Sequence, residues 1–154
     1  MLRIEVDTVI DRPVSDVWEF VIDLKNSPRW TRSGSELRET TTGALGVGTT
    51  IESVRPILGR EIRSQAIVVT EYDPGHVLSI EATVPLIGRA PGGFLFEGVG
   101  AATRLARWGE IDLGRAERLL GPVVVRLLRG GWRAELRNLK GLLEDARRPS
   151  GHVP

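Results

Sequence analysis

Hydrophobic and polar residues alternate over the first ten positions of the chain. One side of this pattern carries Leu2, Ile4, Val6, Thr8 and Ile10, and the other carries Arg3, Glu5 and Asp7. Strict alternation is typical of a strand with one buried face and one wet face, as in antiparallel sheets. The pattern therefore predicts a strand over residues 2–10.

The hydrophobic spacing changes to a helical one directly after this strand. Pro13 suits the first turn of a helix, where its missing N–H costs nothing. Ser27-Pro28-Arg29-Trp30 is typical of a second, shorter helical segment. The first helix is predicted from apolar residues that fall on one face, namely Val14, Val17, Trp18, Val21 and Ile22.

The middle of the chain is typical of strands separated by turns. Glycines at 43–48 and Asp73-Pro74-Gly75 mark two turns. Residues 85–93 are rich in proline and glycine, which predicts a loop. Strands are expected around residues 51–57, 62–71, 77–84, 93–99 and 103–113.

The last third of the chain has helical periodicity from about residue 116 to residue 147. Pro122 lies near the start of this segment and is expected only in the first turn or at a break. Gly130-Gly131 lies in the middle, where each glycine costs about 1 kcal/mol relative to alanine. The periodic residues are Leu120, Val124, Leu128, Trp132, Leu136, Leu139 and Leu143.

These elements predict an α+β fold with one domain over residues 1–148 and a flexible tail over 149–154. About seven antiparallel strands form a curved sheet wrapped around the long C-terminal helix, and two short helices follow the first strand. A bent sheet around one helix need not close fully. A ligand cavity between the sheet and the helix is therefore expected.

This arrangement resembles the START-like (SRPBCC) superfamily, and most closely its bacterial polyketide cyclase/dehydrase-like branch. The resemblance implies a helix-grip fold with an internal pocket for an apolar or aromatic molecule, and it covers nearly the whole chain. The matching residues are Pro13 with Val17-Trp18, Asp23 with Pro28 and Trp30, Gly46 and Gly48, Gly59-Arg60, Tyr72 to Gly75 with Leu78, Thr103-Arg104-Leu105, and Leu139 to Glu144.

Composition excludes several classes of function. The formal net charge is +1 with acidic residues interspersed among the arginines, which gives no reason to expect nucleic acid or an anionic membrane as a partner. The absence of cysteine excludes disulfides and thiol catalysis. No apolar run approaches the ~20 residues of a membrane span, and the first residues lack the pattern of a signal peptide. A cytoplasmic protein without integral membrane association is expected.

Catalytic and metal-binding motifs are also scarce. His76 and His152 are the only histidines, one beside a turn and one in the tail, and both are expected to be exposed. No cluster of residues has the spacing of metal ligands, and the glycines at 43–48 lead into a strand rather than a helix. We therefore predict no catalytic residue, no metal and no cofactor.

Arginine and glutamate supply the polar candidates for the pocket. Arg107 shares the alternation of Leu105 and Ile111 and is expected to point inward, although a register shifted by one would turn Arg104 and Trp108 inward instead. Arg55 is a second inward candidate. Glu135 has the helical phase of Leu128 and Leu139, so it is expected to pair with Arg107 or Arg55.

Aromatic residues supply the apolar candidates. Trp30 follows the second helix and is the residue most expected to touch a ligand. Trp132 lies on the inward stripe of the long helix, directly after the two glycines. Phe94 and Phe96, on the strand over 93–99, complete the predicted ligand-binding set. Trp18 is expected in the core, and Tyr72 is expected to pack at a strand end.

The favoured function is binding of a small hydrophobic or aromatic molecule, of the lipid, polyketide-like or isoprenoid kind, in the cavity. One alternative is an enzyme of the cyclase, aromatase or dehydratase type, in which an arginine polarises a carbonyl. Another is a protein-interaction or quinone-binding module. A homodimer is compatible with all three.

Overall fold

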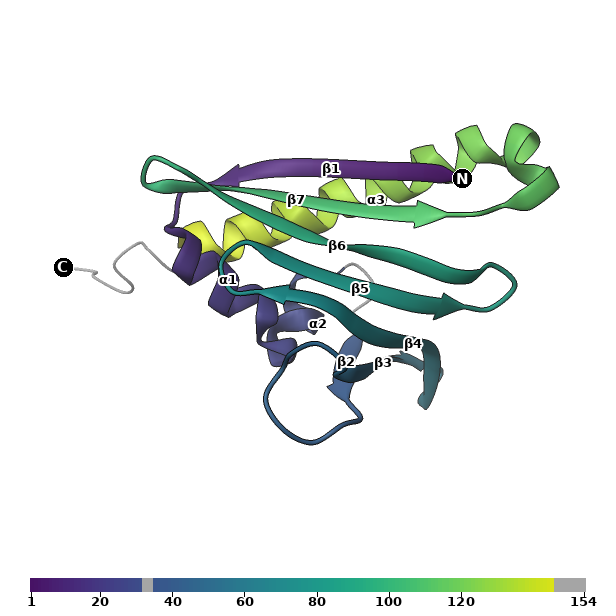
Figure 1. Ribbon diagram of the computed structural model, residues 1–154, viewed down its shortest axis with the longest axis horizontal. Coiled ribbons are helices and arrows are strands. Elements are labelled where there is room, and N and C mark those ends of the chain that lie inside the picture. Colours follow the sequence, from purple (N-terminus) through teal and green to yellow (C-terminus); the bar gives the residue numbers. More distant parts are fainter. Residues whose placement is uncertain (32–34, 146–154) are drawn as a thin grey trace.

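The computed structural model describes residues 1–31 and 35–145. A seven-stranded antiparallel sheet has the order β1-β7-β6-β5-β4-β3-β2, and a long helix lies along one face of it (Figure 1). The sheet gripping one helix confirms the predicted fold class. The strands are β1 (Leu2–Ile10), β2 (Glu36–Glu39), β3 (Thr50–Ile57), β4 (Arg60–Asp73), β5 (Val77–Val84), β6 (Gly88–Val99) and β7 (Ala102–Ile111).

The helices occupy the predicted places along the chain. Two short α-helices and a 3-10 turn between them follow β1, and a second 3-10 turn leads into the long helix that closes the described part. The predicted tail over 149–154 lies outside the described residues. The helices are α1 (Val14–Ile22), η1 (Leu24–Asn26), α2 (Ser27–Trp30), η2 (Gly114–Ala116) and α3 (Glu117–Asp145).

The predicted loop over residues 85–93 is wrong, because β6 already begins at Gly88. Pro91 pairs with Glu81 of β5, but the pairing of β6 with β7 starts only at Gly92. Pro91 therefore lies where one side of the strand has no neighbour. A proline is accommodated there because it need not donate to that side.

Pro122 also departs from the prediction. It lies inside α3, beyond the first turn that begins at Glu117, and the helix continues through it. Proline removes one helical hydrogen bond and crowds the preceding turn. Pro122 is exposed, so water can reach the carbonyl that loses its partner.

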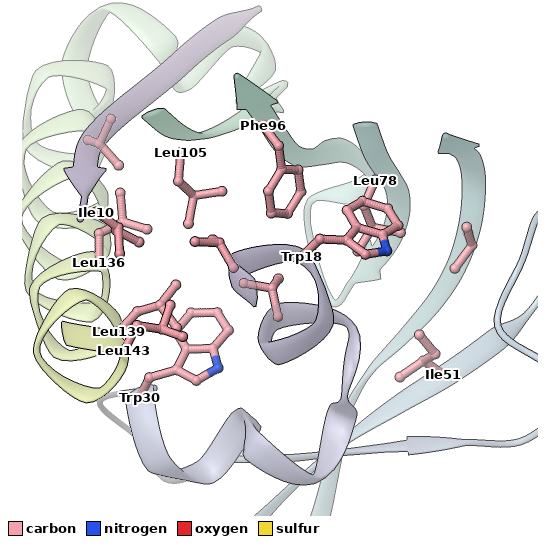
Figure 2. Close-up of a cluster of buried hydrophobic side chains, with 14 of the residues drawn as sticks. Ile10, Trp18, Trp30, Ile51, Leu78, Phe96, Leu105, Leu136, Leu139 and Leu143 are labelled. Carbon is pink, nitrogen blue, oxygen red and sulfur yellow. The ribbon is translucent and has the colours of Figure 1, made fainter. Parts of the chain in front are cut away.

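The core lies between the C-terminal half of α3, the helix α1 and the strands (Figure 2). The rings of Phe96 and Tyr72 form T-shaped pairs with the ring of Trp18 at centroid distances of 5.0 and 5.4 Å. Edge-to-face contacts of this kind add to the stabilisation from burial. Ile10, Leu105, Leu136, Leu139 and Leu143 are all buried around them.

The C-terminal half of α3 is fixed to the turn between β1 and α1. Arg12 donates from Nη1 to the carbonyl oxygen of Leu143 at 2.6 Å and forms an ion pair with Asp16 at 2.8 Å. Thr103 donates from Oγ1 to the carbonyl oxygen of Arg12 at 2.8 Å. These bonds hold one end of α3 against the sheet, and the N-terminal half of the helix runs beside β1, where Gly121 faces Leu2.

Candidate functional site

Small residues occupy the floor beneath the N-terminal half of α3. The strand register places Gly92 of β6 directly opposite Gly109 of β7, and Ile80 of β5 opposite Gly92. The next row pairs Ala82 with Ala90. Cross-strand neighbours share one face of the sheet. The three strands therefore leave a hollow where larger side chains would otherwise meet the helix.

Trp132 of α3 lies directly over this floor. A Cβ atom built on Gly109 would stand 2.7 Å from Cη2 of Trp132, which is closer than side chains pack. Glycine at position 109 is therefore required for the indole to lie against the strand. The close approach of Trp132 to β7 forms one end of the hollow.

The hollow is a pocket of about 430 Å³ between the sheet and α3. This volume falls in the range of small-molecule sites. The strands contribute Ile80, Ala82, Val84, Ala90, Pro91, Gly92, Gly93, Phe94, Arg107, Trp108, Gly109, Glu110 and Ile111, the β5–β6 turn contributes Ile87, and the helix contributes Val124, Leu127, Leu128 and Trp132.

A second depression, of about 480 Å³, lies over β3, β4 and β5. No helix contributes to its lining, and Thr40, Thr50, Glu52 and Thr83 lie among its residues. Ligand sites are concave and mostly apolar, with a few polar groups that fix orientation. The pocket beneath α3 fits that description better.

Arg107 is a charged residue of the pocket lining, and its side chain has several contacts that fix its position. Its guanidinium carbon lies 4.6 Å from the ring centroid of Trp132 and 5.6 Å from that of Phe94. Nη1 of Arg107 donates to Oε2 of Glu135 at 3.2 Å, and the two side chains are only 24% and 16% exposed. Two aromatic rings and one carboxylate thus fix the guanidinium in place.

Burial lowers the pKa of Arg107 from its ordinary value, and Glu135 opposes this shift by its charge and its hydrogen bond. Arginine starts so far above neutrality that it keeps its proton. A guanidinium has five N–H donors, and Glu135 is the one hydrogen-bond acceptor that it reaches among the described residues. Arg107 therefore brings a fixed positive charge and spare donors to an apolar pocket.

Four of the predicted site residues come together here: Phe94, Arg107, Trp132 and Glu135. The predicted pairing of Glu135 with Arg107 is confirmed. The predicted inward register of Leu105 and Arg107 is also confirmed, because Arg104 pairs on the other face with Asp7 at 2.8 Å.

Three other candidates lie outside the pocket. Trp30 is buried and packs edge-on against Phe94 at 6.0 Å, so it is a core residue, although its Nε1 has no hydrogen-bond partner among the described residues. Phe96 is a core residue too, against Trp18. The inward orientation predicted for Arg55 is wrong, because its side chain is exposed.

An irregularity in the strand pairing explains the outward orientation of Arg55. The register of β3 with β4 shifts between Ser53 and Val54, and both of these residues are buried. Two successive buried residues break the period of two. Arg55 therefore falls on the opposite face from the one that simple alternation gives.

The sequence alone did not identify the small residues of the floor as part of a site. Ala82, Ala90, Gly92 and Gly109 are spread over three strands, and each one alone is unremarkable. Their common signal is small size at inward positions opposite a helix with bulky side chains. Only the register between strands shows that these positions adjoin one another.

Gly109→Ala is expected to destabilise the protein by about 1–3 kcal/mol, because the added methyl group would overlap Trp132 and force the indole off its rotamer. Gly130→Ala is the matched control, since nothing lies within 4 Å of its added Cβ. Alanine should stabilise the helix there by up to about 1 kcal/mol. Urea denaturation measures both; equal stability of Gly109→Ala and the wild type would contradict the packing described.

Other kinds of site find no support in the described part of the chain. No group of three or more histidine or acidic side chains there is arranged to hold a metal ion. His76 is exposed in the turn between β4 and β5, and His152 lies outside the described residues. None of the described helices has the length and apolar character needed to cross a membrane.

Solved structures with this fold include several proteins from natural-product biosynthesis. The aromatase/cyclase Zhui from Streptomyces sp. R1128 shares 16% identity over 99% of each chain, with a TM-score of 0.74. The di-domain aromatase/cyclase BexL, from the BE-7585A biosynthetic pathway, shares 21% identity over 97% of this chain and 48% of its own, with a TM-score of 0.76. TTHA0849 from Thermus thermophilus shares 20% identity over 96% of this chain and 100% of its own, with a TM-score of 0.69.

Similarity at these identities establishes the common fold. No curated protein sequence matches the chain. Residues 1–144, which include the whole pocket and the Arg107–Glu135 pair, match the sequence family described as polyketide cyclase/dehydrase and lipid transport. The chain therefore belongs to the polyketide cyclase/dehydrase and lipid transport family.

Proposed function

We propose that this protein binds a small aromatic or otherwise apolar molecule that carries one anionic or strongly polar acceptor group. The apolar part lies between the floor of β5, β6 and β7 and the side chains of Val124 and Leu128. The acceptor group faces Arg107. The observation that carries the proposal is a guanidinium at an apolar pocket of about 430 Å³ that two aromatic rings hold in place, that pairs with one carboxylate and that has further N–H donors.

The energetics of the guanidinium favour a ligand with an acceptor. An apolar ligand alone would remove water from the spare donors of Arg107 and leave them unpaired, which costs free energy. A carboxylate, sulfonate or enolate oxygen would replace that water with a charge-assisted hydrogen bond. Arg107 therefore favours apolar molecules that carry an acceptor oxygen over those that carry none.

Binding is favoured over proton-transfer catalysis because the pocket has few groups that could move a proton. Arg107 stays protonated. Glu135 does not line the pocket and contacts it through Arg107. Glu110, the other ionisable residue of the lining, is held by Arg3 at 3.1 Å. An orienting role for Arg107 needs no such group.

Two fluorescent probes of similar shape test the proposal. Anilinonaphthalene sulfonate is aromatic and anionic, and phenylnaphthylamine is its neutral counterpart. The double variant Arg107→Met/Glu135→Leu removes the guanidinium without leaving a buried carboxylate unpaired. We expect it to lose about tenfold or more in affinity for the sulfonate, the worth of one hydrogen bond to a charged group, and to bind the neutral probe as well as the wild type.

Arg55→Met is the matched control, because it removes an exposed arginine of the same sheet. It should bind both probes like the wild type. If the double variant binds the sulfonate as tightly as the wild type, Arg107 does not recognise the acceptor. If the wild type binds neither probe and retains no small molecule in native mass spectrometry, the binding proposal itself fails.

A second candidate is an enzyme in which Arg107 stabilises the enolate that forms when hydroxide from the solvent takes an α-proton of the bound molecule and becomes water. Two aromatase/cyclases share this fold, and the spare donors of Arg107 suit a developing negative charge. The test is exchange of the α-protons of an aryl ketone with deuterated water, followed by NMR. The enzyme hypothesis expects exchange above the buffer rate that Arg107→Met/Glu135→Leu abolishes; exchange at the buffer rate would count against it.

A further inference from the structure

The N-terminal half of α3 is apolar on its exposed side as well as on its inward side. Leu119, Val123 and Leu127 are 81%, 57% and 69% exposed, and Leu120 is exposed beside them. Residues four apart lie above one another on a helix. These four residues therefore form one continuous stripe, which we call the outer stripe. A contiguous exposed apolar surface marks an interaction site more often than scattered exposed residues do.

Unpaired arginines border the outer stripe. At about 3.6 residues per turn, Arg126, Arg133 and Arg137 fall on or directly beside the line of the helix that runs through Leu119. All three are exposed, and none has an ion-pair partner among the described residues. Arg118 and Arg115 lie at the start of the helix and are likewise exposed and without such a partner there.

Acidic residues do not offset this charge on α3. Glu117 pairs with the N-terminal ammonium group of Met1 at 2.9 Å, and Glu135 pairs with Arg107 at 3.2 Å. Glu144 pairs with Lys140, and Asp145 is the last residue of the helix, eight residues beyond Arg137. The chain as a whole has a formal net charge of only +1. Positive charge is thus concentrated beside the outer stripe, although the composition shows no such excess.

The outer stripe is continuous with the pocket. Leu127 belongs to both, because it is 69% exposed and lines the pocket. On the other side of the pocket, Ile87 lines it while its neighbour Leu86 is fully exposed in the β5–β6 turn. Figure 1 shows this turn and the start of α3 at the same end of the molecule. Two apolar projections therefore flank the pocket at that end.

We propose that this end of the protein docks on the surface of an anionic lipid bilayer, with the outer stripe and Leu86 entering the interface and the arginines contacting lipid headgroups. An interfacial helix combines exposed leucines on one face with arginines beside them. Arginines near an anionic surface are attracted to its lipid headgroups. The docked pocket would exchange an apolar ligand with the bilayer without carrying it through water. This inference goes beyond ligand binding and does not depend on it.

Co-sedimentation with lipid vesicles tests the proposal on the whole protein, without any pocket ligand. We expect binding to vesicles of equal parts phosphatidylcholine and phosphatidylglycerol, weaker binding at high salt, and little binding to phosphatidylcholine alone. Arg126→Gln/Arg133→Gln should lower the partition coefficient at least about tenfold. Leu119→Gln/Val123→Gln should lower it by a similar factor. These positions are exposed, so folding should be unaffected.

Leu58→Gln/Arg60→Gln is the matched control, because it removes an exposed leucine from the β3–β4 turn and an exposed arginine from the start of β4, away from the pocket lining. It should bind vesicles like the wild type. The proposal is overturned if the wild type stays in the supernatant with anionic vesicles, or if the control loses as much binding as the α3 variants. It is also overturned if ultracentrifugation shows a dimer that Leu119→Gln/Val123→Gln dissociates, since a second copy would then cover the stripe. None of these results bears on probe binding by the pocket.

Discussion

Glu135→Leu should lower the free energy of unfolding by about 3 kcal/mol. The substitution leaves the guanidinium of Arg107 without its carboxylate at a position where the side chain is only 24% exposed. Removing one partner of a buried ion pair is strongly destabilising, because the remaining charge has lost its compensation and cannot regain full hydration. Some exposure to the pocket keeps the effect at the low end of the range for such pairs. Urea denaturation followed by tryptophan fluorescence measures it.

The double variant Arg107→Met/Glu135→Leu tests why Glu135→Leu loses stability. It distinguishes the cost of leaving the charge of Arg107 unpaired from the cost of having no ion pair at all. Replacing both charges by apolar side chains of similar size is often neutral or stabilising. We therefore expect the double variant to recover most of the stability that Glu135→Leu loses. A double variant as unstable as the sum of the single ones would show that the two side chains act independently.

Asp7→Asn supplies the control for an exposed pair. Asp7 accepts a hydrogen bond from Arg104 at 2.8 Å on the outer face of β1 and β7, where both side chains are well exposed. Solvent screens such pairs, and their contribution is up to about 1 kcal/mol. If Asp7→Asn costs as much stability as Glu135→Leu, burial is not what makes the Arg107–Glu135 pair costly to break.

The inward orientation of Arg107 and its pairing with Glu135 were predictable, because both follow from the spacing of hydrophobic residues within one strand and within one helix. A strand buried on one face fixes which residues point inward, since a slip of one residue would expose the whole apolar set. The phase of Glu135 on α3 follows in the same way from Leu128 and Leu139. When two inward-facing polar groups of opposite charge share one core, pairing is the arrangement with the lowest desolvation cost.

The orientation of Arg55 and the role of Trp30 were not predictable in this way. The irregularity at Ser53 and Val54 arises from the pairing of two strands, and no residue of β3 alone marks it. Trp30 ends the short helix α2, and whether it meets a ligand or a core side chain depends on how deeply that helix packs. Phe94 covers the ring instead. Such contacts depend on residues far apart in the sequence.

The floor of the pocket also depends on residues that are far apart in the sequence. Gly92 and Gly109 come from strands that are separate in the sequence, and the β6–β7 register alone makes them neighbours. The proline and glycine residues over 85–93 suggested a loop, yet Pro91, Gly92 and Gly93 line the pocket. Small residues at successive inward positions weaken a strand, but in this sheet they make room for Trp132 and for a ligand.

Filling this space should abolish ligand binding without unfolding the protein. Val124→Trp places an indole from α3 into the pocket opposite the floor. We expect the affinity for phenylnaphthylamine to fall at least about thirtyfold, roughly 2 kcal/mol, because a ligand must then displace or overlap the new ring. Fluorescence titration measures the affinity, and urea denaturation checks that the fold remains.

Val123→Trp is the matched control for this change, since the neighbouring residue is 57% exposed and does not line the pocket. The same increase in size there should leave the affinity within about twofold, a difference of roughly 0.4 kcal/mol. If both variants bind the probe like the wild type, the molecule lies elsewhere, and the depression over β3, β4 and β5 becomes the next site to fill. Loss of binding in Val124→Trp alone places the ligand between α3 and the sheet, where Arg107 can determine which acceptor group it carries.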